Sequence, residues 1–327
     1  MTTIAPTTPS PAGSRLEHFP VSFFATVMGS AGLAIAWHKA HLVLGAPAIV
    51  GVVILHLATF LFALLLVLYA AKSVRHPGAV AQERLHPVRI NFFASISIGL
   101  LLLAIGWSGR EPGFARALWS AGALLHLGFT LMAMSSWIHH SHYEIKHANP
   151  AWFIPVVGNI IVPLAGVHFA PLEVSWFFFS IGIVFWPVLL TIILYRLIFH
   201  PALPERLTPT LFILLAPPAV GCLAWVALTG QVDAFARVLF YCALFLLLLL
   251  GIGAMRFLRM PFYLSSWAYS FPLAAVTIVT LVMAEALHAD FLRALAAVLL
   301  GLVSIVVAVL AVRTVVAATR GEICVPE

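Results

Sequence analysis

Residues 47–70 read PAIVGVVILHLATFLFALLLVLYA, a stretch that contains no Asp, Glu, Lys or Arg. A helix needs about 20 mainly apolar residues to cross the hydrocarbon core of a bilayer. This stretch therefore predicts a membrane-spanning helix. Ten runs of this kind follow one another along the chain, near residues 20–37, 47–70, 90–107, 117–138, 151–169, 174–195, 209–229, 238–255, 263–287 and 294–312.

The composition of the whole chain also indicates a membrane protein. Of its 327 residues, 63% are hydrophobic and 9% are charged, and the mean hydropathy is +1.09; an ordinary soluble domain has about a quarter of its residues charged. Only helices and closed barrels satisfy every backbone polar group in lipid, and barrel strands would give short alternating segments instead of unbroken apolar runs. The sequence predicts an all-α integral membrane protein whose ten transmembrane helices form five helical hairpins.

The distribution of basic residues predicts how the helices are oriented. With the N-terminus inside, 12 of the 17 Lys and Arg residues fall on the cytoplasmic side and 5 on the other. This asymmetry follows the positive-inside rule, so we expect both termini in the cytoplasm. Because the basic residues lie in short gaps between apolar runs, the net charge of +6 does not indicate nucleic-acid binding. We expect a disordered cytoplasmic tail at 1–18, a transmembrane domain at 19–318 and a short cytoplasmic tail at 319–327.

Charged side chains are nearly absent from these runs. The one Asp, Glu, Lys or Arg within them is Glu285, near the outer end of the ninth, where we expect it to pair with a neighbouring group. Pumps and ion-coupled transporters usually carry charged or titratable residues at membrane depth. Their absence favours passive conduction over coupled transport.

Neither the cysteines nor the histidines predict a metal site or a cofactor. The three cysteines have no ligand spacing. His56 and His126 do not supply the paired axial ligands of a multi-haem cytochrome, so we interpret them as hydrogen-bonded core residues. The histidine cluster between His139 and His147 lacks Cys or carboxylate partners at regular ligand spacing and lies at a helix end, where imidazoles complement the helix dipole. No nucleophile–base pair or phosphate loop indicates an enzyme.

Prolines inside the runs favour the odd-numbered helices. Five of the six lie there, namely Pro155, Pro163, Pro217, Pro218 and Pro272, and Pro187 lies in the sixth helix. A proline frees a backbone carbonyl, which is tolerated at membrane depth only against protein or a water-filled cavity. The bias indicates that odd helices line a cavity. The alternative is that proline and small residues are common in membrane helices in general.

The ninth helix contains the segment Trp267-Ala268-Tyr269-Ser270-Phe271-Pro272. Pro272 disturbs the helix, and Phe271 places a large ring beside the disturbance. If this helix lines a cavity, the ring can plug it, because a hydrophobic constriction blocks ions by dewetting. Simple core packing is the alternative for this aromatic residue.

Several of these segments resemble those of a known family. Over residues 19–318 the chain resembles the tellurite-resistance/dicarboxylate transporter family, which includes bacterial TehA and the plant slow-type anion channels. The resemblance rests on Pro20-Val21-Ser22-Phe23-Phe24 followed by Met28-Gly29 and Trp37, on His86-Pro87-Val88-Arg89, on Pro155-Val156-Val157-Gly158-Asn159 and on the segment at 267–272.

The resemblance implies an anion channel of a bacterial inner membrane. Each protomer of a homotrimer would hold its own pore inside an inner ring of odd helices, with the even helices as an outer ring against the lipid bilayer. Phe271 would occlude the pore, and Pro272 would kink the helix next to this gate. The permeant species would be small monovalent inorganic anions such as chloride and nitrate, attracted by helix amides and dipoles without a fixed cation.

Five further positions are weaker candidates. Gly29, Gly99, Gly158 and Gly221 are expected to line the pore because small residues leave space for an ion, with helix packing as the alternative for each. Arg89, at the cytoplasmic end of the third helix, would attract anions to the inner mouth or would serve only to set the topology.

Two other functions remain open at this point. An ion-coupled secondary exporter of organic acid, sulfite or tellurite would need a coupling site, and its reversal potential would shift with pH. A haem-bearing membrane enzyme would show a Soret absorption band.

Overall fold

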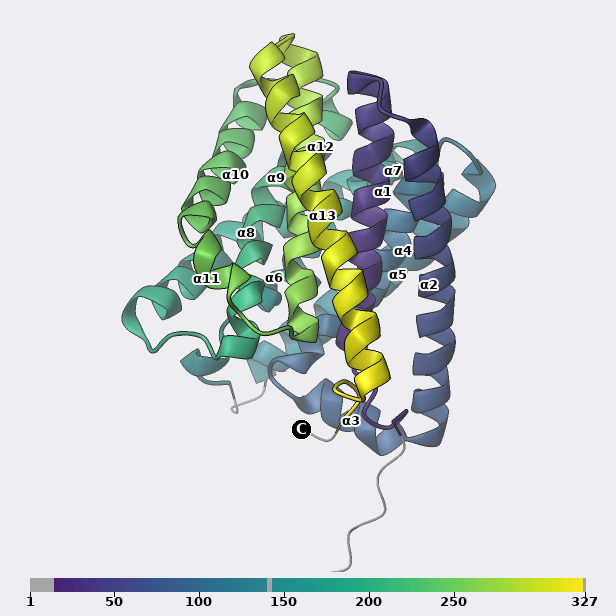
Figure 1. The fold of residues 1–327 in the computed structure, drawn as a ribbon, viewed down its shortest axis with the longest axis vertical. Helices are drawn as coiled ribbons and strands as arrows, with labels where there is room; N and C mark the ends of the chain where they lie inside the picture. Colours follow the sequence, from purple (N-terminus) through teal and green to yellow (C-terminus); the bar gives the residue numbers. More distant parts are fainter. Residues whose placement is uncertain (1–14, 140–142, 326–327) are drawn as a thin grey trace, which may run out of the picture.

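The computed structural model describes residues 15–139 and 143–325 (Figure 1). The expected N-terminal tail up to residue 14, together with His140 and His142, lies outside these residues. The described chain is all helical and contains ten helical spans long and apolar enough to cross a membrane, which confirms the predicted fold class. The spans are Val21–Leu44, Ala48–Arg75, Arg89–Trp107, Pro112–His139, Pro150–Phe169, Leu172–Phe199, Glu205–Thr229, Ala234–Ile252, Leu264–Leu287 and Asp290–Arg320.

The even-numbered spans are single continuous α-helices. They are α2 (Ala48–Arg75), α5 (Pro112–His139), α8 (Leu172–Phe199), α10 (Ala234–Ile252) and α13 (Asp290–Arg320). Three short helices lie in the connections between spans: α3 (Pro77–Leu85), η3 (Ile145–His147) and α11 (Ala254–Leu258).

Every odd-numbered span instead begins with a 3-10 segment and then changes to α-helix. The first, third, seventh and ninth consist of η1 (Val21–Phe23) with α1 (Phe24–Leu44), η2 (Arg89–Phe93) with α4 (Ala94–Trp107), η6 (Glu205–Leu215) with α9 (Ala216–Thr229), and η7 (Leu264–Tyr269) with α12 (Ser270–Leu287). The fifth changes more than once, through η4 (Pro150–Trp152), α6 (Phe153–Val157), η5 (Gly158–Ile161) and α7 (Pro163–Phe169).

The odd spans form the interior of the bundle and the even spans cover them. In the most apolar 18-residue window of each odd span, 61–89% of the residues are buried, against 28–33% in each even span. The contacts among odd spans run in a closed order, since α1 packs on α4, α4 on η5, η5 on α9, α9 on α12 and α12 back on α1.

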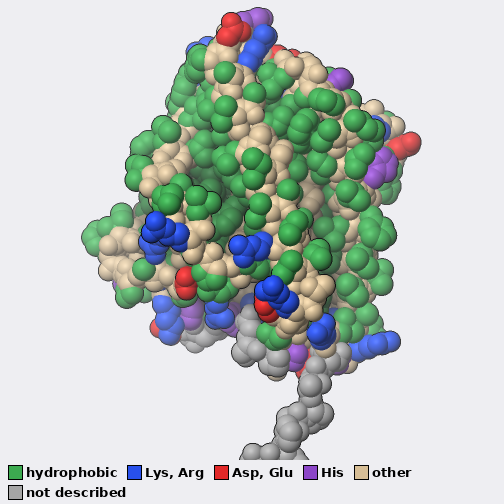
Figure 2. Space-filling view, in the orientation of Figure 1, with side chains coloured by type: hydrophobic (Ala, Val, Ile, Leu, Met, Phe, Trp, Pro, Cys, Tyr) green, Lys and Arg blue, Asp and Glu red, His purple; other side chains and the backbone are tan. Residues whose placement is uncertain are grey.

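The outer surface separates apolar and basic regions. Figure 2 shows a largely uncharged, apolar middle, while Lys and Arg gather near the end where Figure 1 places α3 and the C-terminus. We call this the basic end. Each even span brings the chain back to the basic end, so all five odd spans start there. Their dipoles are parallel and direct their positive ends toward it.

The helices extend beyond the apolar runs at several points. α2 continues to Arg75 and α13 to Arg320, because a helix keeps its backbone hydrogen bonds in the interface and long basic side chains reach water from its ends. The longer helical spans therefore include charged residues that the apolar runs did not, among them Lys39 and Lys72. Glu285 does pair with a neighbour, as Lys39 Nζ lies 2.6 Å from its Oε2.

Candidate functional site: a central cavity at the helix junctions

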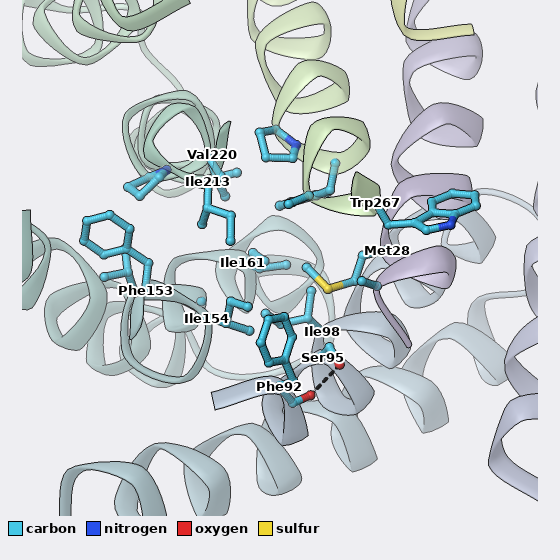
Figure 3. Close-up of a pocket in the computed structure, with 18 of the residues that line it drawn as sticks. Met28, Phe92, Ser95, Ile98, Phe153, Ile154, Ile161, Ile213, Val220 and Trp267 are labelled. Carbon is cyan, nitrogen blue, oxygen red and sulfur yellow. Dashed lines mark hydrogen bonds between the residues drawn. The ribbon is translucent and has the colours of Figure 1, made fainter. Parts of the chain in front are cut away.

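A cavity of about 70 Å³ lies where the odd spans change from 3-10 to α-helix (Figure 3). Its lining residues come from all five odd spans, and none of those described comes from an even span. Most of the labelled side chains in Figure 3 surround a shared apolar space, whereas the Trp267 indole points away from it. They include Met28, Phe92, Ile98, Ile154, Ile213 and Val220.

Hydroxyl side chains support the helix junctions around this cavity. Thr26 Oγ1 donates to the Phe23 carbonyl at 2.7 Å, and Ser270 Oγ donates to the Trp267 carbonyl at 2.6 Å. Ser95 donates in the same way to the carbonyl three residues before it. A change of helix type leaves carbonyl groups without a regular partner, and in lipid each such group must be satisfied inside the protein. These hydroxyls therefore allow the junctions to exist at the centre of the bundle.

The fifth span is broken between Pro155 and Pro163, and an amide side chain bridges the break. Asn159 Nδ2 donates to the Val156 carbonyl at 2.8 Å and to Thr130 Oγ1 of α5 at 2.9 Å. The Thr130 hydroxyl in turn lies 2.6 Å from the Pro155 carbonyl. Two spans thus supply hydrogen bonds to the carbonyls of Pro155 and Val156 at the break, and they fix this wall of the cavity.

Of the two histidines expected in the core, His56 is exposed on α2, where its Nδ1 lies 2.8 Å from the Val52 carbonyl oxygen of the same helix, so that expectation was wrong. His126 does belong to the core, because it is fully buried on α5 and its Nδ1 lies 2.9 Å from Ser97 Oγ of α4. Its ring packs over Gly158, where an added Cβ would come 2.8 Å from Cε1. Among the described residues, no group of three or more His, Cys, Asp or Glu is arranged to hold a metal ion.

Phe271 and Pro272 both line the central cavity. The Phe271 side chain is buried, at 7% exposure, in the first turn of α12. The preceding 3-10 segment is anchored to the tenth span, because Trp267 Nε1 donates to Thr314 Oγ1 at 2.9 Å. This hydrogen bond fixes the backbone segment that precedes Phe271. Its function as a gate stays a prediction.

Of the four candidate glycines, Gly158 alone lines the cavity. Gly29 faces the Ser270 side chain, Gly99 faces the Phe62 ring of α2, and Gly221 faces Leu239 of α10. These three positions serve contacts between helices, which was the alternative left open for each. The sequence did not identify the bulky apolar residues that line most of the cavity.

These contacts predict opposite effects of adding a methyl group at two of the glycines. In Gly29→Ala the new Cβ would overlap the Ser270 side chain, so we expect a loss of about 1–3 kcal/mol in stability. In Gly221→Ala the nearest atoms lie 3.6 Å away, an ordinary contact, and alanine favours a helix over glycine by about 1 kcal/mol. Thermal denaturation of the two purified variants checks this, and a Gly29→Ala variant as stable as wild type would contradict the packing assignment.

A second cavity of about 460 Å³ lies at the basic end. We call it the vestibule. It shares Ser22, Phe92, Leu264 and Ser265 with the lining of the central cavity, so the two are adjacent. Charged and titratable side chains of both kinds line the vestibule: Arg89, Arg206, Lys72, His18, His86 and Tyr263, and the carboxylates of Glu17, Glu83 and Glu322. Arg89 thus lies beside this cavity, and its place at the inner mouth of a pore and its effect on ions stay predictions.

Tyr263 adds no negative charge to the vestibule near neutral pH. Desolvation and the nearby Glu205 carboxylate both raise the pKa of its phenol above the ordinary value. The phenol donates a hydrogen bond to Glu205 Oε2 at 3.3 Å.

A buried ion pair fixes one wall of the vestibule. Lys72 Nζ of α2 lies 3.1 Å from Glu83 Oε2 of α3, and both side chains are under 5% exposed. Lys72 also donates to the Phe19 carbonyl at 2.8 Å, and the Tyr69 hydroxyl donates to Glu83 at 2.8 Å. The other Glu83 oxygen accepts from the Val21 amide at 3.3 Å, where η1 begins. The pair thus joins α2, α3 and the start of the first span.

Fold and cavity together define a multi-pass α-helical membrane protein with a central cavity that adjoins a vestibule at its basic end. The sequence profile of the family described as "SLAC1: Voltage-dependent anion channel" matches residues 18–315. The chain therefore belongs to this family, which confirms the resemblance seen in its motifs.

Curated relatives carry related names. The chain is 28% identical to the S-type anion channel SLAH3 of Arabidopsis thaliana over 92% of its own length and 48% of the relative. It is 28% identical to the guard cell S-type anion channel SLAC1 of the same plant, over 91% and 56% respectively. It is 26% identical to the tellurite resistance protein TehA homolog of Haemophilus influenzae, over 79% of each chain. The chain spans about half the length of these plant channels.

Proposed function

We propose that the protein is an anion channel that passes small monovalent anions such as chloride and nitrate. The observation that carries the proposal is the central cavity, which is built from the odd spans, contains no charged lining residue among those described, and adjoins a vestibule at the basic end. Family membership supports the same reading. The names of the relatives are those of anion channels, an uncharacterized transporter and a tellurite resistance protein homolog.

Anions are favoured by the arrangement of charge along the path. Arg89 and Arg206 line the vestibule, and the parallel dipoles of the odd helices present their positive ends at the same mouth. Among the described residues, no Asp, Glu, Lys, Arg or His lines the central cavity. An ion there meets neither a fixed charge that would trap it nor a titratable group that would couple it to protons.

Phe271 is the proposed gate. Its ring lines a cavity whose other lining side chains are mostly apolar, and a hydrophobic constriction too narrow to stay wet excludes ions. Movement of the ring off the axis of the path would open it, and Pro272, beside the ring, is proposed to hold the local bend. Gly158 is the one candidate glycine retained as a pore-lining position.

The assembly and setting of the channel follow from the same proposal. We place the basic end and both termini in the cytoplasm of a bacterial inner membrane, on the strength of the positive-inside rule. The partly exposed even spans are proposed to face lipid and the neighbouring protomers of a homotrimer. Each protomer would have its own pore.

The reversal potential of purified protein in planar bilayers tests the proposed function. We expect it to follow an imposed chloride gradient and to stay unchanged when a pH gradient is imposed alone. The Phe271→Ala variant supplies a current large enough for this measurement. A reversal potential that moves with the pH gradient would instead support the ion-coupled exporter. A Soret absorption band in the pure protein would support the haem enzyme.

A further inference from the structure

Gly32 of α1 lies directly behind the Phe271 ring. An added Cβ at Gly32 would come 3.2 Å from Phe271 Cδ2 and 3.2 Å from the Ala274 Cβ. Gly32 is buried and does not line the cavity, whereas Phe271 does. The ring therefore lies between the bare backbone of α1 on one side and the open space on the other.

We propose that Gly32 is the positioning residue of the gate, and this inference rests on the proposed function of Phe271. The missing side chain forms a recess on α1 into which the ring settles and can retract. A distance of 3.2 Å is closer than ordinary carbon contacts of about 3.5–4.0 Å, so a methyl group at Gly32 would displace its neighbour. The Phe271 side chain can turn about its χ1 and χ2 bonds, and the space open to it is the cavity.

The inference predicts a specific coupling between positions 32 and 271. The Phe271→Leu variant keeps a Cδ atom at the place where the phenyl ring faces Gly32. It lacks the outer atoms of the ring, so the path is wider and this variant is expected to conduct. Adding Gly32→Ala should lower that current by about threefold or more, because the Cδ methyl is pushed into the path. In a Phe271→Ala background, Gly32→Ala should leave the current within about 1.5-fold of that of the Phe271→Ala variant alone, since residue 271 then has no Cδ atom.

Two further variants separate the gate from general packing. Gly99→Ala is a matched control, because its Cβ would meet the Phe62 ring at 3.3 Å, and Phe62 lines neither cavity. It should not change the current in either background. Ala274→Gly removes the second contact of the added methyl. It should not restore the current of the Gly32→Ala, Phe271→Leu protein if the Cδ contact is responsible.

The measurement is chloride current per reconstituted protein, with monodisperse elution from size-exclusion chromatography as the folding check. If Gly32→Ala lowers the current equally in the Phe271→Leu and Phe271→Ala backgrounds, or if Ala274→Gly restores the current, Gly32 does not position the ring. Neither result would contradict Phe271 as the gate. If Phe271→Leu and Phe271→Ala conduct no more than wild type, the proposed gate is itself wrong and the inference falls with it.

Discussion

Replacing Phe271 with alanine is expected to raise the chloride current by about tenfold or more. The ring lies in the wall of a cavity of only about 70 Å³, so removing it enlarges a narrow apolar passage. A wider passage stays wet, and hydrated anions then cross without shedding their water shells. The current should remain selective for anions over cations, because Arg89, Arg206 and the helix dipoles at the basic end are unchanged.

Phe62→Ala is the matched control for this experiment. Phe62 is buried to the same degree, at 6% exposure against 7% for Phe271. It packs from α2 against neighbouring helices and lines neither cavity. Both variants lose a buried ring and both should lose stability for that reason. Only Phe271→Ala should gain current. A folded Phe271→Ala protein that conducts no more than wild type would contradict the gate, and an equal gain in both variants would indicate a general leak.

The spans could be predicted from the sequence because lipid imposes a strong constraint. Ten long apolar runs leave helices as the one arrangement that satisfies the backbone, and the structure places a helix on each run. The bias of prolines toward odd spans was also informative. Pro155 and Pro163 lie at a real break, and Pro217 and Pro218 open α9 after a 3-10 segment.

The faces of the interior helices could not be predicted. In a soluble protein the alternation of polar and apolar residues shows which side of a helix is buried, but the odd spans are apolar on every side. Gly29, Gly99 and Gly221 therefore looked equivalent to Gly158, although they contact neighbouring helices. For the same reason nothing in the sequence distinguished Met28 or Ile213, which line the cavity, from other apolar residues.

Contacts between residues of different helices could not be predicted from the sequence either. Lys72 looked like a loop residue that sets topology, yet it lies in α2 and pairs with Glu83 of a short helix that follows. Charge alone does not reveal such a pair, because its formation depends on how α3 folds back against the bundle.

The second large effect is expected from breaking this buried pair. In Glu83→Gln the Lys72 ammonium stays buried without its carboxylate, and the removal of one partner from a buried ion pair costs about 3–5 kcal/mol. Glutamine has one oxygen in place of two, so it can accept from the Tyr69 hydroxyl or from the Val21 amide but cannot replace both acceptors, and this lost hydrogen bond adds to the cost of the unpaired charge. Thermal denaturation of the detergent-solubilised protein should show a clear loss of stability.

Glu285→Gln is the matched control, because its partner Lys39 lies at the opposite end in a partly exposed pair. Exposed pairs contribute about 0–1 kcal/mol, so this variant should denature nearly as wild type does. The double variant Lys72→Met, Glu83→Gln removes both charges, and an apolar side chain in place of a buried ion often restores stability. Recovery in the double variant would show that the uncompensated ammonium causes the loss. If the double variant is as unstable as Glu83→Gln, the contacts of Lys72 with the first span matter more than its charge, because methionine cannot replace the hydrogen bond to the Phe19 carbonyl.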